Sequence, residues 1–316
     1  MTPALEIRGV SKRFGSLEAV RPLDLVAQRG ALIGLLGPNG AGKSTLIRMI
    51  MSLIRPDTCE LRVLGGDALD MKDRIGYLPE ERGVYRRMRV EDFLFYIGRL
   101  KGLPPSGLRA RIAGWLERVE LPGVAHKRCQ ELSKGMQQKV QFVAAVLHDP
   151  ELIVLDEPFS GLDPVNARVL IQAVRDLHRE GRTIFLSTHQ MTQAEQLCQR
   201  IVLINRGDKI LYATVGDALT RFSPRGIDVE PVIDPEQACS ALRQMPGVAS
   251  AQWRSEASSI QVAIDEGADA VSLLAAIAQS VPARRIEVAR VSLDDVFVRL
   301  VEGHGGHARV PVRGAA

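Results

Sequence analysis

The stretch Gly37-Pro38-Asn39-Gly40-Ala41-Gly42-Lys43-Ser44-Thr45 satisfies the pattern G-x-x-x-x-G-K-[ST] and decides the fold of the first part of the chain. It follows the apolar run 32–36, which predicts a buried strand, and it precedes residues 43–54, whose apolar positions recur with helical periodicity. A glycine-rich loop in this position turns its backbone N–H groups and the helix dipole toward phosphate oxygens. The stretch therefore predicts a nucleotide site in which Lys43 faces the β and γ phosphates and the Ser44 hydroxyl ligates Mg²⁺.

Two adjacent carboxylates, Asp156 and Glu157, follow the apolar run 152–155, which predicts a second buried strand. Asp156 is expected to hold Mg²⁺ through water, as the second acidic element of a nucleotide site. Glu157 is placed to polarise a water molecule for in-line attack on the γ phosphate. A pair of acids at the end of a strand can also serve solubility alone, but the phosphate loop earlier in the chain favours the catalytic interpretation.

The order of patterns along the chain predicts two domains. Short apolar runs alternate with helical patterns over residues 1–222, which indicates an α/β domain with a partly parallel sheet and, given the loop 37–45, a P-loop NTPase; the pattern is mainly helical at about 90–147, which predicts a helical subdomain. After the breakers at 222–226, a small α+β domain of ferredoxin-like order βαββαβ is expected over 226–302. Its elements are strands 227–232, 249–253, 259–264 and 285–291, helices 236–245 and 268–280, and a last helix 293–301. The glycine- and proline-rich segment 303–316 is expected to be a disordered tail.

Composition excludes several classes of protein. The 316 residues are 46% hydrophobic, which is enough to bury a core in each of two domains. No apolar run approaches the roughly 18 residues that a bilayer crossing needs, and the start of the sequence lacks a signal-peptide core, so a cytosolic chain is expected. Four cysteines without a C-x-x-C pair suggest buried reduced thiols rather than a zinc site or a disulfide framework.

Charge gives little support to a nucleic-acid binder, because 41 basic residues nearly balance 37 acidic ones and leave a net charge of +4. One segment is lopsided. Residues 82–128 contain eleven Lys or Arg against four Asp or Glu. This segment either faces an acidic partner or lipid headgroups, or is a solvated helical face.

Further motifs make a family resemblance specific. The segment Leu132-Ser133-Lys134-Gly135-Met136-Gln137-Gln138-Lys139 lies about twenty residues before the two acids and resembles the signature of the ATP-binding cassette family. Ser160-Gly161-Leu162-Asp163 and then His189 fall where that family has its next motifs, and Phe14 occupies the aromatic position on which such proteins stack adenine. The resemblance covers roughly residues 4–220 and involves six spaced motifs.

The resemblance implies a cassette that is incomplete as a monomer. In the family, two cassettes sandwich two ATP molecules head to tail. Each ATP lies between the phosphate loop 37–45 of one subunit and Ser133 and Gly135 of the other. His189 would then touch the γ phosphate and hold the attacking water in line, and Asp163 would carry contacts across the dimer.

Two departures from the family pattern stand out. Glu80 replaces the usual glutamine, and Lys134 replaces the more common glycine inside the signature. A carboxylate ligates Mg²⁺ more directly than an amide does, so Glu80 is a candidate metal ligand, although it adds negative charge beside phosphate. The appended domain and its ending at 291–297 resemble the exporter subset of the family, the sodium, drug and antibiotic efflux type.

The combined expectation is an ATP-hydrolysing subunit with ATP and Mg²⁺ as cofactors. It would work as a dimer with itself or a homologous cassette on the inner face of the cell membrane, and would energise separately encoded permease subunits. One alternative is a soluble cassette ATPase acting on ribosomes or DNA, but such relatives commonly carry two cassettes or a long coiled coil, and neither pattern is present. A regulator without turnover is opposed by Lys43, Asp156, Glu157 and His189 occurring together.

Overall fold

The computed structural model describes residues 2–81, 83–222, 226–255, 257–265, 267–289 and 291–304. The chain folds into two units, a larger one that includes the residues up to Val215 and a smaller one from Gly216 to Arg299. The two units divide after Val215, seven residues before the domain boundary that the sequence predicts at 222. The boundary at 222 therefore stays a prediction. The predicted linker residues 223–225 and most of the predicted tail, 305–316, lie outside the described residues.

A six-stranded sheet forms the centre of the larger unit, in the order β5-β6-β7-β3-β8-β9. The strands are β5 (Ile75–Leu78), β6 (Leu152–Asp156), β7 (Thr183–Thr188), β3 (Leu32–Leu36), β8 (Arg200–Asn205) and β9 (Asp208–Thr214). The first five are parallel, and β9 pairs with β8 in the antiparallel sense. Every residue of β3, β6 and β7 is buried, which explains the unbroken apolar runs of β3 and of β6 up to Leu155; β7 also buries Thr183, Ser187 and Thr188 at its ends.

A second, antiparallel sheet of order β2-β1-β4 lies beside the first. It consists of β2 (Leu17–Ala27), β1 (Leu5–Phe14) and β4 (Thr58–Val63). Its buried side chains and those of helix α1 (Lys43–Ile50) share one hydrophobic core with the central sheet; Ile7, Leu46 and Val154 are members. Because this core surrounds α1, it fixes the helix that begins at Lys43.

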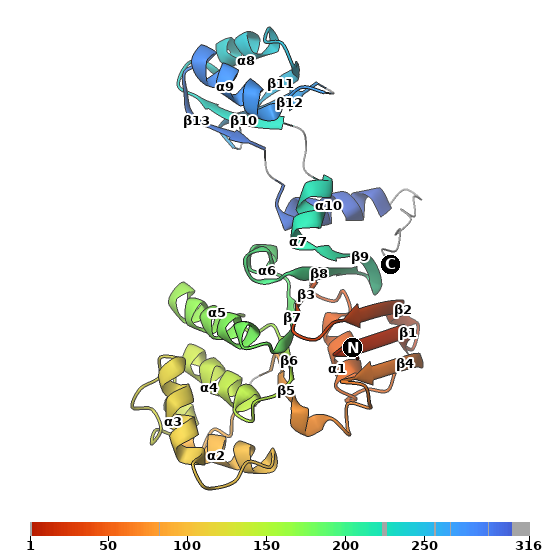
Figure 1. The fold of residues 1–316 in the computed structure, drawn as a ribbon, viewed down its shortest axis with the longest axis vertical. Coiled ribbons are helices and arrows are strands. Elements are labelled where there is room, and N and C mark those ends of the chain that lie inside the picture. Colours follow the sequence, from red (N-terminus) through yellow and green to blue (C-terminus); the bar gives the residue numbers. More distant parts are fainter. Residues whose placement is uncertain are drawn as a thin grey trace. The chain divides into compact units, whose positions relative to one another are not determined.

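Helices gather on the opposite side of the central sheet from β1, β2 and β4 (Figure 1). The expected helical subdomain contains α2 (Val90–Leu100), α3 (Leu108–Arg118) and α4 (Lys134–Val146), with 3₁₀ turns at Lys72–Arg74 and Cys129–Glu131 nearby in the sequence. The other helices on this side are α5 (Pro164–Arg179) and α6 (Met191–Leu197), whereas α7 (Val215–Phe222) lies almost wholly in the smaller unit. In the part of the chain that the structure describes, no helix is both long and apolar enough to cross a membrane.

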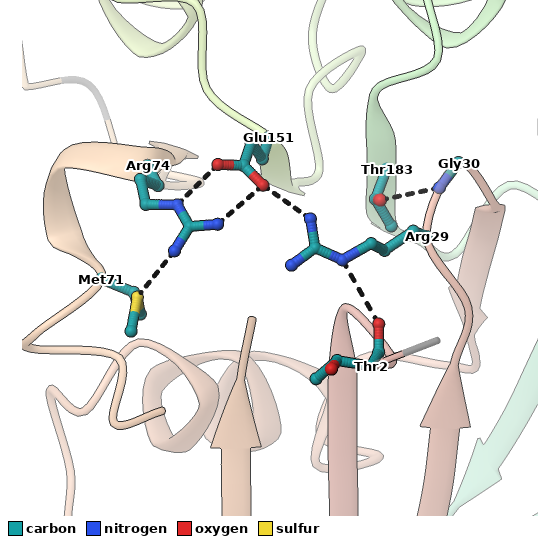
Figure 2. A network of polar contacts seen from close by, with 7 residues as sticks. All are labelled: Thr2, Arg29, Gly30, Met71, Arg74, Glu151 and Thr183. Atoms are coloured by element: carbon teal, nitrogen blue, oxygen red, sulfur yellow. Dashed lines mark hydrogen bonds and ion pairs between the residues drawn. The ribbon is translucent and has the colours of Figure 1, made fainter. Parts of the chain in front are cut away.

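A network of charged groups ties together the amino ends of the central strands (Figure 2). Glu151, just before β6, accepts hydrogen bonds from Arg74 Nε at 2.5 Å and from Arg29 Nη1 at 2.7 Å. The N–H of Gly30 donates to the Thr183 hydroxyl at the start of β7, at 2.9 Å. Because both guanidinium groups favour the carboxylate, the pKa of Glu151 falls to about 2.

The smaller unit has the predicted βαββαβ order. It contains β10 (Gly226–Pro231), α8 (Pro235–Arg243), β11 (Val248–Arg254), β12 (Ser259–Ile264), α9 (Ala270–Ser280) and β13 (Ala283–Val288). The sheet order is β11-β12-β10-β13, with every pairing antiparallel, and side chains of both helices join strand residues such as Val229 and Val262 in a separate core. The expected fold class, a P-loop cassette followed by a ferredoxin-like domain, is confirmed.

Two smaller expectations can be compared with the structure. The last helix, α10, spans Leu293–His304 and so includes the first two residues of the predicted tail. Cys129, Cys198 and Cys239 are free and buried, as predicted. Burial raises the pKa of the Cys198 thiol to about 12, which keeps it protonated and unreactive.

Candidate functional site

A pocket of about 950 Å³ lies where the phosphate loop, the start of β2 and the β8–β9 turn meet. The predicted site residues that line it are Phe14, the loop Asn39, Gly40, Ala41, Gly42, Lys43, Ser44 and Thr45, and the two acids Glu80 and Glu157. The volume is at the upper end of the range for small-molecule sites. The structure therefore brings together residues from four distant parts of the sequence.

The phosphate loop approaches other backbone segments so closely that two of its glycines admit no side chain. A Cβ added at Gly37 would lie 2.1 Å from the carbonyl oxygen of Ile204, at the end of β8. Gly42, which caps α1, has a φ of 106°, and its added Cβ would lie 2.3 Å from the carbonyl oxygen of Ala19. Only glycine fits at these two positions. Any side chain would clash with a backbone carbonyl, and a residue other than glycine would strain the backbone at these positive φ angles.

Lys43 is the first residue of α1, and its ammonium group lies within the loop. Nζ donates to the carbonyl oxygens of Gly37 at 2.8 Å and Pro38 at 3.2 Å, and lies 3.6 Å from Glu157 Oε1. The side chain is only 6% exposed. A buried ammonium with one distant carboxylate as its charge partner has a strong preference for an incoming anion.

Asp156 ends β6 as a buried carboxylate that accepts a hydrogen bond from the Ser187 hydroxyl of the neighbouring β7. Burial raises its pKa, while hydrogen bonds from Ser187 and from Ser44 act in the opposite direction. The Ser44 hydroxyl and the Asp156 carboxylate thus lie side by side. These two hard oxygen atoms fit the chemistry of a Mg²⁺ site, in which one or two protein oxygens join those of phosphates and water.

Glu157 has the most unusual environment in the site. Its φ of 49° places a non-glycine residue in the left-handed region, and its N–H donates to the carbonyl oxygen of Ser187 at 3.1 Å. Oε2 shares a hydrogen bond with His189 Nδ1 at 3.0 Å, whereas Oε1 is buried with no hydrogen-bond partner among the described residues. Strain and an unsatisfied carboxylate oxygen beside a pocket are the features of a residue arranged for a ligand rather than for stability.

His189 follows β7 directly, and its side chain is 40% exposed. Its hydrogen bond to Glu157 fixes the ring beside the pocket, so the second ring nitrogen is available to a bound molecule. Phe14, which also lines the pocket, ends β1 with 46% of its surface exposed, and Lys12 Nζ lies 5.5 Å from its ring centroid. An exposed aromatic face at a pocket is a suitable stacking platform for a base.

Seven predicted residues do not line this pocket themselves. Four of them adjoin residues that do, namely Gly37, Pro38, Asp156 and His189, whereas Ser133, Gly135 and Asp163 belong to another surface. Ser133 caps α4, with its hydroxyl accepting from the N–H of Met136 at 3.2 Å, and it is exposed. Gly135 lies against Asn166 of α5, because an added Cβ would be 3.1 Å from Asn166 Nδ2.

Asp163 caps α5 by accepting from the N–H groups of Val165 at 3.0 Å and Asn166 at 2.9 Å. Hydrogen bonds from Asn166 hold the pKa of Asp163 below its ordinary value. With Gly135 against Asn166, the starts of α4 and α5 therefore form a second surface of the same unit.

Sequence reasoning missed three arginines that line the pocket, Arg13, Arg21 and Arg206. Arg13 and Arg21 belong to strands β1 and β2, and Arg206 lies in the β8–β9 turn. No motif marks them, because they reach the pocket only through strand pairing. The one available signal is that Arg13 adjoins Phe14 in the sequence.

Comparisons with known proteins agree with this geometry. Residues 20–160 match the family model described as "ABC transporter", and residues 221–301 match that of the C-terminal domain of DrrA1-3-like ATP-binding proteins. An uncharacterized ABC transporter ATP-binding protein of Alkalihalophilus pseudofirmus is 41% identical over 269 residues, covering 84% of this chain and 98% of that protein.

A more distant relative has an assigned process. The Nod factor export ATP-binding protein I of Ralstonia nicotianae is 35% identical over 223 residues, covering 69% of this chain and 70% of that protein. Among solved structures, an ATP-binding subunit of an ABC transporter is 30% identical with a TM-score of 0.64, covering 70% of this chain and 93% of that one.

Proposed function

The chain belongs to the family of ABC transporter ATP-binding proteins, and on this basis we propose that it binds and hydrolyses ATP in the described pocket in order to drive export through separate permease subunits. Members of this family hydrolyse ATP, and the chain is an ATPase subunit of that kind. The residue roles, the Mg²⁺ ion, the partners and the direction of transport are the parts that we propose.

The observation that carries the proposal is the arrangement of Lys43 and Glu157, which line the pocket, with His189, which contacts Glu157. The Lys43 ammonium is 3.6 Å from Glu157 Oε1, and the opposite oxygen of Glu157 contacts His189 at 3.0 Å. When a triphosphate occupies the loop, Lys43 would turn to its β and γ phosphates. Glu157 would then be free to accept a hydrogen bond from a water molecule, which His189 would keep in line with the γ phosphate.

Mg²⁺ would be held at the Ser44 hydroxyl and near the Asp156 carboxylate, and would neutralise charge on the phosphates. The raised pKa of Asp156 supports this role, since a buried carboxylate beside phosphate gains most from a cation. Glu80 lines the same pocket and is exposed to it, so its carboxylate is a further candidate ligand. Phe14 would stack on the adenine ring.

A second copy of the chain, or a homologous cassette, would complete the site. Ser133 and Gly135 begin α4 on an exposed surface, and Asp163 begins α5 beside them. A helix N-terminus attracts phosphate, so this surface of one subunit would face the γ phosphate held by the other. Lys134 is exposed and leaves this approach open.

The permease would dock on the helical part of the larger unit. Tyr85 and Tyr96 expose 51% and 43% of their surfaces and form an edge-to-face aromatic cluster with the buried Phe93. Arg86 and Arg87, both exposed, follow Tyr85. Exposed aromatic rings flanked by arginines are typical of protein interfaces. Export, rather than import, is supported by the Nod factor export relative and by the DrrA1-3-like C-terminal domain.

Co-purification from membranes of the native host tests the partner. A tagged wild-type chain should retain an integral membrane protein after detergent solubilisation, and this protein should be lost when Tyr85 and Tyr96 are both replaced by serine. The matched control is the ATPase rate of the isolated double variant, which should equal that of the wild type because neither tyrosine lines the pocket. Retention of ribosomal proteins or DNA, in place of a membrane protein, would contradict the proposal. Accumulation of cargo inside inverted vesicles with ATP would then establish export.

A further inference from the structure

The β8–β9 turn holds an arginine in a conformation that arginine disfavours. Asn205 and Asp208 pair at the ends of the two strands, so Arg206 and Gly207 form a two-residue turn. Their φ angles are 49° and 81°. Two successive positive φ angles are the pattern of a type I′ hairpin turn, whose first central position favours asparagine, aspartate or glycine. An arginine there strains the backbone without serving the turn.

Three contacts fix this turn against the phosphate loop. The N–H of Gly207 donates to the carbonyl oxygen of Ala41 at 2.9 Å, and the N–H of Arg21 donates to the carbonyl oxygen of Gly207 at 2.9 Å. A Cβ added at Gly207 would lie 3.0 Å from the carbonyl oxygen of Glu18, so β2 presses closely on the turn. Arg206 is therefore held next to the middle of the loop, and it lines the pocket.

The cations of the pocket differ in whether a carboxylate already neutralises them. Arg13 forms an ion pair with Glu18, and Arg21 pairs with Asp208 at 2.6 Å and with Glu18 at 3.3 Å. Lys43 faces Glu157. Within the described ranges, Arg206 has neither an ion pair nor a hydrogen bond from its side chain, and it is exposed.

We propose that Arg206 is a nucleotide-binding residue whose guanidinium group contacts the phosphates of the bound nucleotide; this inference rests on the proposed function of the pocket. A planar guanidinium beside the loop can donate two hydrogen bonds to phosphate oxygens. The strained turn places this group beside the phosphate loop. The stability of the turn therefore favours asparagine or glycine at residue 206, whereas phosphate binding favours arginine. Measuring stability and affinity separately distinguishes the two effects.

The test compares the full chain with Arg206→Asn, Arg206→Lys and the control Arg55→Asn. Asparagine suits the left-handed position and removes the charge, and lysine keeps the charge without the planar fork. Arg55 is an exposed arginine outside the pocket, so its replacement changes the net charge equally. Calorimetric titration with ADP gives the affinity, competition with adenosine gives the share of the base and ribose, and thermal unfolding without nucleotide gives stability.

We expect Arg206→Asn to weaken ADP binding by about fivefold to tenfold, as loss of a charge-assisted hydrogen bond at an exposed site would do. Its Tm without nucleotide should be equal to that of the wild type or higher by about 1–3 °C. Arg206→Lys should recover part of the affinity, and Arg55→Asn should bind like the wild type. Adenosine affinity should be the same in all four proteins.

Three results would overturn the inference. The first is an ADP affinity of Arg206→Asn within twofold of the wild type. The second is weaker binding accompanied by a lower Tm, which would assign a structural role to Arg206. The third is an equal loss for adenosine, which would move the contact to the base or ribose. A wild-type chain that binds no ADP would instead contradict the proposed function, and this outcome is recognised without any Arg206 variant.

Discussion

Acidic residues lie at both ends of strand β6, but their carboxylates differ in how many hydrogen bonds they accept. Before the strand, Glu151 accepts hydrogen bonds from Arg74 on both oxygens and from Arg29 on one, and its pKa falls to about 2. At the other end, burial raises the pKa of Asp156, and Glu157 Oε1 is buried with no hydrogen-bond partner among the described residues. Only five residues thus separate the satisfied carboxylate of Glu151 from the unsatisfied one of Glu157.

This difference shows how one strand serves two purposes. Glu151 joins segments that begin three different strands, and its charge is fully matched without any ligand. Among the described residues, the side chains of Asp156 and Glu157 meet the Lys43 ammonium and a few hydroxyl or imidazole groups, so they gain most when a cation or water molecule arrives. Substitution of Glu151 should therefore change the stability of the fold, whereas substitution of Glu157 should change the rate of ATP hydrolysis.

The largest effect is expected for Glu157→Gln. An amide cannot accept a proton from the attacking water, so the turnover rate should fall by about a hundredfold or more while MgATP still binds. The free energy of unfolding of the unliganded chain should change little, because the amide removes a buried negative charge and at the same time loses the pairing with Lys43. ATPase rate, nucleotide titration and chemical denaturation measure the three quantities. A wild-type rate in this variant would remove Glu157 from its proposed role.

Glu151→Gln should have the reverse signature. The loss of two charge-assisted contacts should lower the free energy of unfolding by about 1 kcal/mol, a small value because the side chain is 35% exposed and solvent screens it. Turnover should stay at the wild-type rate. A large loss of activity without a loss of stability would break the contrast between the two ends.

The pH dependence of the same pair sharpens this prediction. Because the folded-state pKa of Glu151 lies below the ordinary 4.5, its contribution is complete above about pH 4.5 and disappears as the pH falls through 2. The stability difference between the wild type and Glu151→Gln should therefore shrink by about half by pH 3. A constant difference across this range would show that the carboxylate charge is not its source.

The smallest effect is expected for Glu80→Gln. Glu80 follows the carboxyl end of β5 and is the third acid near this end of the parallel strands, after Asp156 and Glu157. Hydrolysis should persist, and the free Mg²⁺ concentration for half-maximal rate should change by about twofold to threefold if the carboxylate ligates the metal. The increase in ATPase rate that the permease causes should fall by more than the affinity for nucleotide does. Mg²⁺ titrations of the two proteins, followed by rates with the permease, measure both. Identical curves and identical stimulation would exclude a metal-sensing role of Glu80.

The sequence determined the fold class and most of the pocket because both depend on local patterns. Buried parallel strands require unbroken apolar runs, as in β3 and β6, and the loop 37–45 requires glycine where Ile204 and Ala19 approach. The βαββαβ order of the smaller unit was likewise visible in its periodicity. Strand ends and helix ends differ by a few residues, for example β13 at Ala283–Val288 instead of 285–291, since ends depend on packing.

Only the tertiary structure decided which charges are neutralised. Arg13, Arg21 and Arg206 are similar in the sequence, but their charge partners differ. Pairing of β1 with β2 places Arg13 beside Glu18, and contact of β2 with the β8–β9 turn places Arg21 beside Asp208, whereas Arg206 has no carboxylate partner among the described residues. The same holds for Glu151 and Glu157, whose partners come from segments more than 25 residues away along the chain. A carboxylate or guanidinium interacts over a few ångströms of space, whereas sequence patterns record only neighbours along the chain, so these environments follow from the folded arrangement alone.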